Sequence, residues 1–303
     1  NLLTVHNANA IQAYYRQQMS DPAQPMLNRP LVRSYPPGST FKLITAAAAL
    51  ENGLVTPDSL VAAPATFQLP GSTKKLRNWQ RGKCAKSETI TLTVALAVSC
   101  NTSFAILGDK VGADALRRQA RNFGFDSSFH VPMTSAISRF PSNPDRAQTA
   151  LSAIGQFDVQ ATALQMAVVT AAIADGGMVM NPYLVDRVLA PDLTILRQTT
   201  PTARNRAIKP ETAAALAEMM EQVVSAGTGG NARMWGTAVA GKTGTAQTAQ
   251  GSKPHAWFVG FAPAANPRVA VAVVIENGGG SAEVSGNKLA APIAREVMKA
   301  VLK

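Results

Sequence analysis

The sequence predicts an α+β fold, with an antiparallel sheet flanked by helices and joined to an all-helical subdomain. The main predicted helices lie in the middle of the chain, between Ser39 and Ser225, and the apolar period changes to two from Ala238. Three consecutive strands follow, which we place at 238–248, 256–262 and 269–276. Because strands gather at the end of the chain and do not alternate with helices, α+β is favoured over α/β.

Composition restricts the class of protein. The chain has 303 residues, of which 46% are hydrophobic, so it is long enough for one large core or two modest domains. The sequence contains no run of about 18 apolar residues, so it predicts no membrane span. The N-terminus lacks a signal peptide pattern, so for a protein that works outside the cell we expect that an export segment has been removed.

Charge and cysteines exclude some functions. The formal net charge is +11, but the basic residues are scattered and not interleaved with aromatics, which argues against nucleic acid. A basic surface facing anionic cell-wall polymers or lipid headgroups fits equally well. Cys84 and Cys100 alone do not make a zinc site, and we expect no metal. A disulfide between them and a pair of free thiols both remain open.

The first half of the chain contains the first candidate site. We expect a helix around 10–15, a proline-punctuated loop over 21–30, and then a helix that begins at Ser39 and ends before Gly53. Ser39 and Lys42 are three residues apart, so the amine and the hydroxyl share one face of the first turn. A serine hydroxyl becomes a good nucleophile when a neighbouring base takes its proton.

A second Pro-Gly-Ser-x-x-Lys motif tests how specific this signal is. The serine of this motif is Ser72 and its lysine is Lys75, and the polar, basic stretch 76–83 follows it. We expect a loop there, with no rigid helix to hold the pair. Residues 54–88 as a whole are predicted to be loop with short extended pieces such as 66–69.

The second candidate site lies between two helices. A short apolar helix is predicted over 91–98, and helical pattern resumes at Ser103. The break places Ser99 and Asn101 on a turn, where their side chains can point into a cleft.

The remaining elements alternate between helix and loop before the sheet. We predict helices at 112–120 and 161–174, the second buried and central, with a loop over 126–146 between them. A strand pair at 183–199, a helix at 210–225 opened by proline, and a closing helix at 289–302 complete the chain.

The third candidate site is Lys242-Thr243-Gly244-Thr245 on the first predicted strand. Gly244 would let a substrate backbone lie close to the strand. Thr243 and Thr245 would place their hydroxyls on one face, beside the charge of Lys242. This edge suits an extended peptide that ends in a carboxylate. The alternative is an edge lysine that only discourages aggregation.

The three motifs occur in the order found in penicillin-recognising serine acyltransferases. Ser285-Gly286-Asn287 falls after the Lys242 strand and so is out of order. The chain resembles the class B penicillin-binding proteins over roughly residues 26–303. The segments that carry this resemblance are 35–42, 154–156, 164–167, 174–177, 241–246 and 256–263. Ser99-Cys100-Asn101 and the Pro-Gly-Ser-Thr loop resemble the actinobacterial penicillin-binding protein A branch.

The resemblance implies a D,D-transpeptidase that cross-links peptidoglycan stem peptides and is inhibited by β-lactams. Its fold would be that of the β-lactamase-like serine transferases, without a cofactor. Ser39 would form the acyl-enzyme, Lys42 would be the general base, and Ser99 would relay a proton between Lys42 and Lys242.

The resemblance also implies the substrate contacts. Asn101 would hold the substrate amide, and Thr243 with Thr245 and Lys242 would bind the terminal carboxylate. The backbone N–H groups of Ser39 and Thr245 would form the oxyanion hole. None of the three histidines lies in a nucleophile-base motif, and His255 is expected to be structural, so lysine is the expected base.

The resemblance further implies an extracytoplasmic location, partners in cell-wall synthesis during division or elongation, and a membrane anchor outside this chain. We expect residues 1–303 to be one transpeptidase domain without its N-terminal strands, pedestal domain and anchor, because residues 1–30 do not resemble the strand pair of the family. Phe157 stands where the family has a small residue.

Three alternatives use the same fold. A serine β-lactamase needs a deacylating base, but glutamate is absent between Glu88 and Glu211, and Asn101 does not fit the Ser-x-Val motif of lysine-carbamate enzymes. A D,D-carboxypeptidase differs only in letting water attack the acyl-enzyme. A non-enzymatic penicillin sensor would stay acylated.

Overall fold

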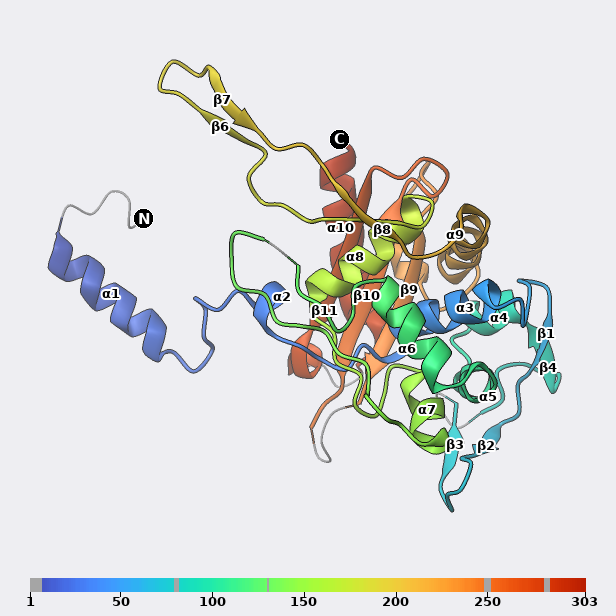
Figure 1. Ribbon diagram of the computed structural model, residues 1–303. Helices are drawn as coiled ribbons and strands as arrows, with labels where there is room; N and C mark the ends of the chain where they lie inside the picture. The colour runs from blue at the N-terminus through green and yellow to red at the C-terminus, as the bar shows by residue number, and fades with distance from the viewer. Residues whose placement is uncertain (1–6, 79–81, 130, 248–251, 281–283) are drawn as a thin grey trace.

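The computed structural model describes residues 7–78, 82–129, 131–247, 252–280 and 284–303. Figure 1 shows a body of helices around one central sheet, with two elements that project from it. The predicted α+β class is confirmed.

The central sheet consists of the three predicted strands. These are β9 (Ala240–Ala246), β10 (His255–Ala262) and β11 (Val269–Ile275), in the antiparallel order β11-β10-β9. Trp257 pairs with Gly244 and Val274, so the middle strand is bonded on both sides and β9 is an edge. The predicted first strand was too long at its start, and its last residue, 248, lies outside the described residues.

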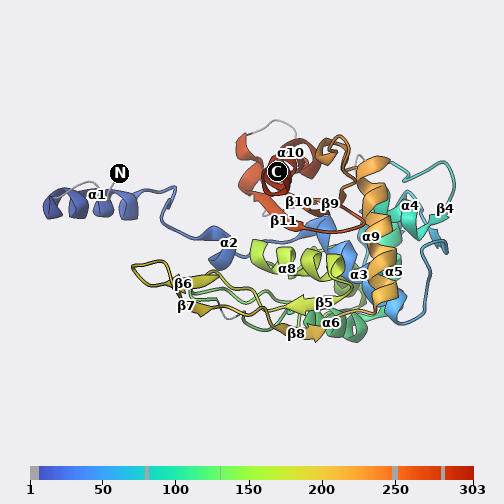
Figure 2. The same cartoon turned by 90° about the horizontal axis from the view of Figure 1, so that it is seen from above.

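Side chains alternate between the two faces of β10 and bring a helix layer to each face. Trp257, Val259 and Phe261 pack into the large core with α3 (Lys42–Glu51) and α8 (Ala163–Ala174). Phe258 and Ala262 pack on the other face against α10 (Gly286–Leu302). Figure 2 shows these layers, with α10 on one side of the sheet and α8 on the other.

The helical part lies beside edge strand β9. It contains α4 (Leu92–Ala97), α5 (Asn101–Val111), α6 (Ala113–Asn122) and α7 (Arg146–Ser152), and α9 (Pro210–Ser225) packs against both α4 and β9. Two small antiparallel pairs extend it, β1 (Leu60–Ala62) with β4 (Thr89–Thr91) and β2 (Thr66–Gln68) with β3 (Lys75–Arg77). The cleft described below opens between this part and β9.

Two elements project from the body at the end opposite α4 and α5 (Figures 1 and 2). Helix α1 (Ala8–Ser20) buries none of its residues, and the hairpin of β6 (Arg187–Leu189) and β7 (Ile195–Gln198) is exposed throughout. The predicted strand pair at 183–199 is therefore confirmed. Among the described residues, the remaining short elements are α2 (Arg29–Val32), β5 (Met178–Met180), β8 (Ala203–Arg206) and the 3₁₀ turns at Gly38–Phe41, Gly230–Ala232 and Glu276–Gly280.

Several local predictions were wrong. Ser39 lies in a 3₁₀ turn, and the α-helix starts only at Lys42, because the tight turn changes to α geometry there. Helix α5 begins at Asn101 directly after the break and not at Ser103. The stretch predicted as loop after Ser72 contains strand β3, and α7 was not predicted. Within the described residues no helix is long and apolar enough to cross a membrane.

Candidate active site

The turn that carries Ser39 is fixed by glycines. Gly38 has φ +54°, and its N–H donates to Gly155 O at 2.9 Å. A Cβ on Gly155 would lie 2.1 Å from Gly38 O, and one on Gly38 would lie 2.9 Å from Thr245 O. Because glycine has no side chain, the turn at Gly38, the loop at Gly155 and the strand at Thr245 can meet at Ser39. The Ser39 side chain is half-buried and faces the cleft.

Residues from three segments that are distant in sequence meet behind Ser39. Lys42 Nζ lies 2.7 Å from Ser99 O, 2.7 Å from Asn101 Oδ1 and 3.3 Å from Ser99 Oγ. Lys242 Nζ lies 2.9 Å from the same Ser99 Oγ and donates to Thr243 O at 2.9 Å. Ser99 therefore bridges the two amines. Its φ of +58° results from the sharp break between α4 and α5.

Both amines are completely buried, and burial disfavours their charged form. Desolvation first, and then the neighbouring Lys242, lower the pKa of Lys42 well below its ordinary value. Desolvation lowers the pKa of Lys242 to about 7. A buried Lys242 does not act as a solvated edge charge, so the alternative of a lysine placed against aggregation does not describe it.

The contacts of Lys42 can be made by a neutral amine. Such an amine has two N–H groups and one lone pair, and two of its three partners, Ser99 O and Asn101 Oδ1, can only accept. The lone pair is then free to accept a proton from a hydroxyl. No hydrogen bond between Lys42 Nζ and Ser39 Oγ is present among the described residues, although the spacing predicts that the amine can reach the hydroxyl. Lys42 is instead engaged by Ser99 and Asn101.

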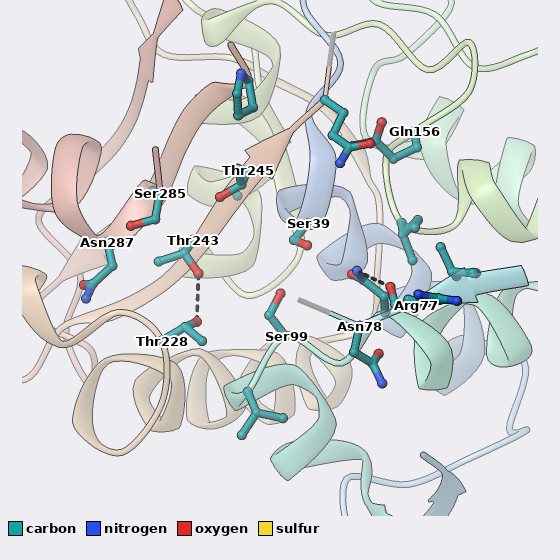
Figure 3. A pocket seen from close by; sticks show the side chains of 18 of the residues that line it. Ser39, Arg77, Asn78, Ser99, Gln156, Thr228, Thr243, Thr245, Ser285 and Asn287 are labelled. Atoms are coloured by element: carbon teal, nitrogen blue, oxygen red, sulfur yellow. Dashed lines mark hydrogen bonds between the residues drawn. The ribbon is translucent and has the colours of Figure 1, made fainter. Parts of the chain in front are cut away.

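Edge strand β9 forms one wall of the cleft. The side chains of Thr243 and Thr245 line it as predicted from their alternation, and Thr228 Oγ1 lies 2.7 Å from Thr243 Oγ1 (Figure 3). Gly244 differs from its prediction. A Cβ there would lie 3.0 Å from Pro37 O, so this glycine lets β9 pack on the Ser39 turn rather than admitting a substrate backbone. The Cα of Gly244 faces the side of the strand opposite to the Thr243 and Thr245 side chains, because successive residues of a strand face opposite sides.

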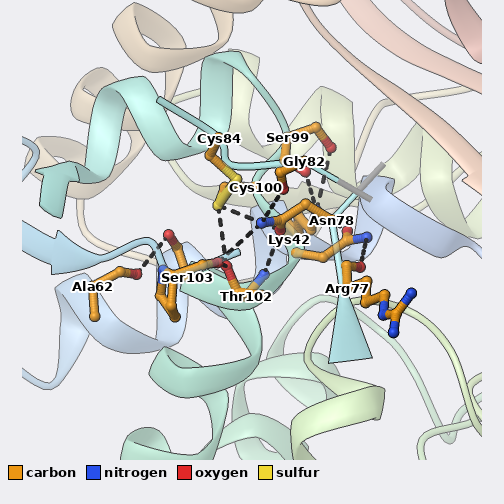
Figure 4. Close-up of a disulfide and its surroundings, with 12 residues drawn as sticks. Lys42, Ala62, Arg77, Asn78, Gly82, Cys84, Ser99, Cys100, Thr102 and Ser103 are labelled. Atoms are coloured by element: carbon orange, nitrogen blue, oxygen red, sulfur yellow. Dashed lines mark hydrogen bonds between the residues drawn. A yellow bond between two sulfur atoms is a disulfide. The ribbon is translucent and has the colours of Figure 1, made fainter. Parts of the chain in front are cut away.

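The β2–β3 hairpin forms the opposite wall. Asn101 Nδ2 donates to Arg77 O at 3.3 Å, and Thr102 N donates to Asn78 Oδ1 at 3.0 Å. A disulfide joins Cys84 to Cys100 (Figure 4), with an S–S distance of 2.02 Å. Of the two states that the sequence left open, the structure therefore has the bonded one. The disulfide ties the segment after the hairpin to the residue between Ser99 and Asn101.

The walls enclose a cleft of about 740 Å³. In Figure 3, Ser39 lies between Thr243 and Thr245 on one side and Arg77 and Asn78 on the other. The cleft is lined by Ser39, Lys75, Leu76, Arg77, Asn78, Val98, Ser99, Asn101, Ile154, Gln156, Thr228, Thr243, Gly244, Thr245, Gln247, Pro254, Ser285, Gly286 and Asn287. Phe157, the departure noted above, is not among these residues. Among the described residues no cluster of His, Cys, Asp or Glu fits a metal ion.

Sequence reasoning missed several residues of the cleft. Lys75 ends the repeated Pro-Gly-Ser motif and Arg77 lies in the basic stretch after it, both of which were predicted to be loop. Ser285 and Asn287 belong to the out-of-order Ser-Gly-Asn. Thr228 follows α9 in a glycine-rich turn, which was the available signal for it. His255 is structural as expected, since its Nδ1 accepts from Asn277 N at 3.0 Å.

A buried lysine pair bridged by a serine, next to a serine on a helix-initiating turn, defines the class of serine acyltransferases that act through a lysine base. The transpeptidase family, described as the penicillin binding protein transpeptidase domain, matches residues 3–299. The chain belongs to this family.

Among its relatives is the peptidoglycan D,D-transpeptidase PbpA of Mycobacterium tuberculosis, 44% identical over 311 residues, which cover 100% of this chain and 62% of the relative. PbpA of Mycolicibacterium smegmatis is 42% identical, with the same coverage of 100% and 62%. The chain thus spans about 62% of the length of these curated relatives.

Solved structures agree with this assignment. The ceftriaxone acyl-enzyme complex of penicillin-binding protein A from M. tuberculosis superposes with a TM-score of 0.94 at 42% identity, covering 100% of this chain and 68% of that one. The D,D-transpeptidase domain of a peptidoglycan glycosyltransferase from Eggerthella lenta gives a TM-score of 0.84 at 33% identity, covering 98% and 73%.

Proposed function

We propose that this chain is the catalytic domain of a peptidoglycan D,D-transpeptidase that works through a Ser39 acyl-enzyme and is inhibited by β-lactams. The observation that carries the proposal is the Ser99 hydroxyl held between two buried amines, 2.9 Å from Lys242 Nζ and 3.3 Å from Lys42 Nζ, behind the half-buried Ser39. The names of the mycobacterial relatives support it.

In the first step, Ser39 Oγ attacks the carbonyl between the two terminal D-alanines of a stem peptide, and Lys42 accepts the hydroxyl proton. A neutral lysine is required for this, which the lowered pKa of Lys42 supplies. Hydrogen bonds of this kind often shorten only when substrate is bound, which accounts for the missing contact between Ser39 and Lys42 in the free protein.

The negative charge that develops on the carbonyl oxygen needs donors. The N–H of Ser39 lies in the first turn of a 3₁₀ helix, and Thr245 lies on an edge strand, where backbone groups lack a second partner strand. We assign the oxyanion hole to these two N–H groups. Removing one such donor from other enzymes slows them by about 10²- to 10³-fold.

The C–N bond then breaks and the leaving D-alanine amine takes up a proton. Ser99 relays this proton from the lysine pair, because its hydroxyl contacts both amines. Asn101 holds the substrate amide, and Thr243, Thr245 and Lys242 bind the terminal carboxylate, with the Gly244 backbone between the threonines. An acceptor amine from a second stem peptide finally attacks the acyl-enzyme and releases Ser39. A β-lactam opens its own C–N bond in the first step and remains attached.

We also propose that the domain acts on the extracytoplasmic side, where peptidoglycan is assembled. The disulfide between Cys84 and Cys100 supports this, because such bonds persist in oxidising compartments. The pedestal domain, the membrane anchor and the cell-wall synthesis partners that the resemblance implies stay predictions.

The test is the intact mass of the protein, followed over hours after mixing with benzylpenicillin, for the wild type and Ser39→Ala. We expect one long-lived adduct in the wild type and none in the variant. Rapid loss of the adduct would instead indicate a β-lactamase, and an adduct on Ser39→Ala would place the nucleophile elsewhere. Incubation with a stem peptide and an acceptor amine then separates the activities, because a carboxypeptidase gives only the hydrolysed product and a sensor gives none.

A further inference from the structure

We propose that Lys75 and Arg77 form a subsite for a free carboxylate of the donor peptide, upstream of the scissile bond. The inference rests on the proposed function and narrows its substrate to peptides that carry a negative charge near the terminal D-alanines. The two residues belong to β3, in the hairpin whose Pro-Gly-Ser motif resembles the nucleophile motif only in sequence.

The two side chains are cations without a counterion. Lys75 and Arg77 are two apart on a strand, so they project from the same face, and both are exposed and line the cleft. Within the described part of the chain neither side chain makes an ion pair or a hydrogen bond. They are also the only charged residues among the described ones that line the cleft, so this end of it is positive.

Hydrogen bonds fix the position of this pair relative to the reacting groups. Asn101 donates from Nδ2 to Arg77 O at 3.3 Å and accepts at Oδ1 from Lys42 Nζ at 2.7 Å. One side chain therefore separates the Arg77 backbone from the proposed base. The next residue, Asn78, is held by Thr102 N, and the disulfide closes the segment behind it. The hairpin is thus built into the site.

The direction of the bound peptide decides which part of it meets the pair. Under the proposed function the terminal carboxylate lies at Thr243 and Thr245, so the leaving D-alanine occupies that side of Ser39. The acyl part of the donor must then extend to the other side, where Arg77 lies (Figure 3). A guanidinium binds a carboxylate through two parallel hydrogen bonds, and a nearby ammonium adds a second attraction.

The experiment compares two thioester donors that both end in D-alanyl-thioglycolate. They differ only in the preceding residue, which carries either a side-chain carboxylate or the matching carboxamide. Ser39 Oγ attacks the thioester carbonyl, the C–S bond breaks, and the released thiol is measured with a colorimetric disulfide reagent. The readout is the ratio of kcat/KM for the two donors, because this ratio cancels any difference in the amount of active protein.

We expect the wild type to prefer the carboxylate donor about fivefold at low ionic strength, and less at high salt, as for a partly exposed ion pair. The double variant Lys75→Gln/Arg77→Gln should bring the ratio to about one. Lys74→Gln is the matched control, since Lys74 is exposed on the same hairpin but does not line the cleft, and it should keep the preference.

Two results would overturn the inference: a ratio of about one in the wild type, or an unchanged preference in the double variant. Benzylpenicillin acylation of the same samples separates this failure from that of the proposed function. A protein that forms the Ser39 adduct but shows no preference refutes only the subsite. A protein that forms no adduct and cleaves neither thioester refutes the transpeptidase assignment itself.

Discussion

Replacing Ser99 with alanine removes the hydroxyl that contacts both buried amines. The hydroxyl lies 2.9 Å from Lys242 Nζ and 3.3 Å from Lys42 Nζ, so both contacts are lost together. Lys42 keeps its bonds to Ser99 O and Asn101 Oδ1, and Lys242 keeps Thr243 O. The variant therefore disconnects the two amines while each retains a partner.

We expect Ser99→Ala to slow acylation strongly and to lower the free energy of unfolding only moderately. A positioned proton-transfer group contributes about 10²- to 10⁴-fold, so we expect acylation by benzylpenicillin to slow at least about 100-fold. Stability should fall by only about 1 to 3 kcal/mol, because two hydrogen bonds are lost and each typically contributes about 0.5 to 1.5 kcal/mol. The positive φ of Ser99 adds little to this difference, because serine and alanine both carry a Cβ there.

The assay is the second-order rate constant of acylation, measured by stopped reaction and intact mass, together with urea unfolding of each protein. Ser103→Ala is the matched control, since it removes another buried hydroxyl from the same region, one that donates to Ala62 O at 2.8 Å and touches neither lysine. The reasoning is refuted if folded Ser99→Ala acylates at the wild-type rate, or if Ser103→Ala slows acylation equally.

Three further predictions concern stability. Because the pKa of Lys242 is lowered to about 7, the unfolded chain binds more protons than the folded one above that pH. This lysine therefore makes the free energy of unfolding rise by up to about 1.4 kcal/mol per pH unit between pH 7 and 10. Urea unfolding of Lys242→Met should show a smaller rise than the wild type, because only Lys42, whose pKa is also lowered, still contributes. Gly155→Ala should lower Tm far more than Gly53→Ala, and it should abolish acylation. Both glycines have a positive φ, but a Cβ on Gly155 would lie 2.1 Å from a backbone atom, whereas a Cβ on Gly53 would have no atom within 4 Å. Equal melting shifts would contradict this. Cys84→Ser/Cys100→Ser should lower the free energy of unfolding by about 3 kcal/mol, given the 16-residue separation, and an unchanged urea midpoint would show that the bond does not stabilise the fold.

Elements with a strong period were predictable from the sequence. The three strands of the central sheet and helix α8 follow directly from apolar runs, and the motif residues Ser39, Lys42, Ser99, Asn101 and Lys242 are brought together in the structure. Local sequence did not separate a 3₁₀ turn from an α-helix at Ser39, because the two differ only in which carbonyl each N–H selects.

The second wall of the cleft was not predictable. Strand β3 has only three residues, two of them charged, and it forms only because β2 pairs with it and Asn101 holds its last carbonyl. Which face of β9 Gly244 leaves open depends on the Ser39 turn, which packs against it. Both are long-range contacts, for which a single sequence carries no signal.

The buried lysines also link anion binding to proton uptake. A carboxylate bound at Thr243 and Thr245 favours the charged form of the neighbouring buried Lys242, so binding near or above pH 7 draws a proton from solvent. Anion affinity must then fall as pH rises, while the fraction of neutral Lys42 increases. The two trends oppose each other, so turnover of a carboxylate-ended substrate follows a bell-shaped pH profile whose alkaline limb belongs to binding and whose acid limb belongs to the base.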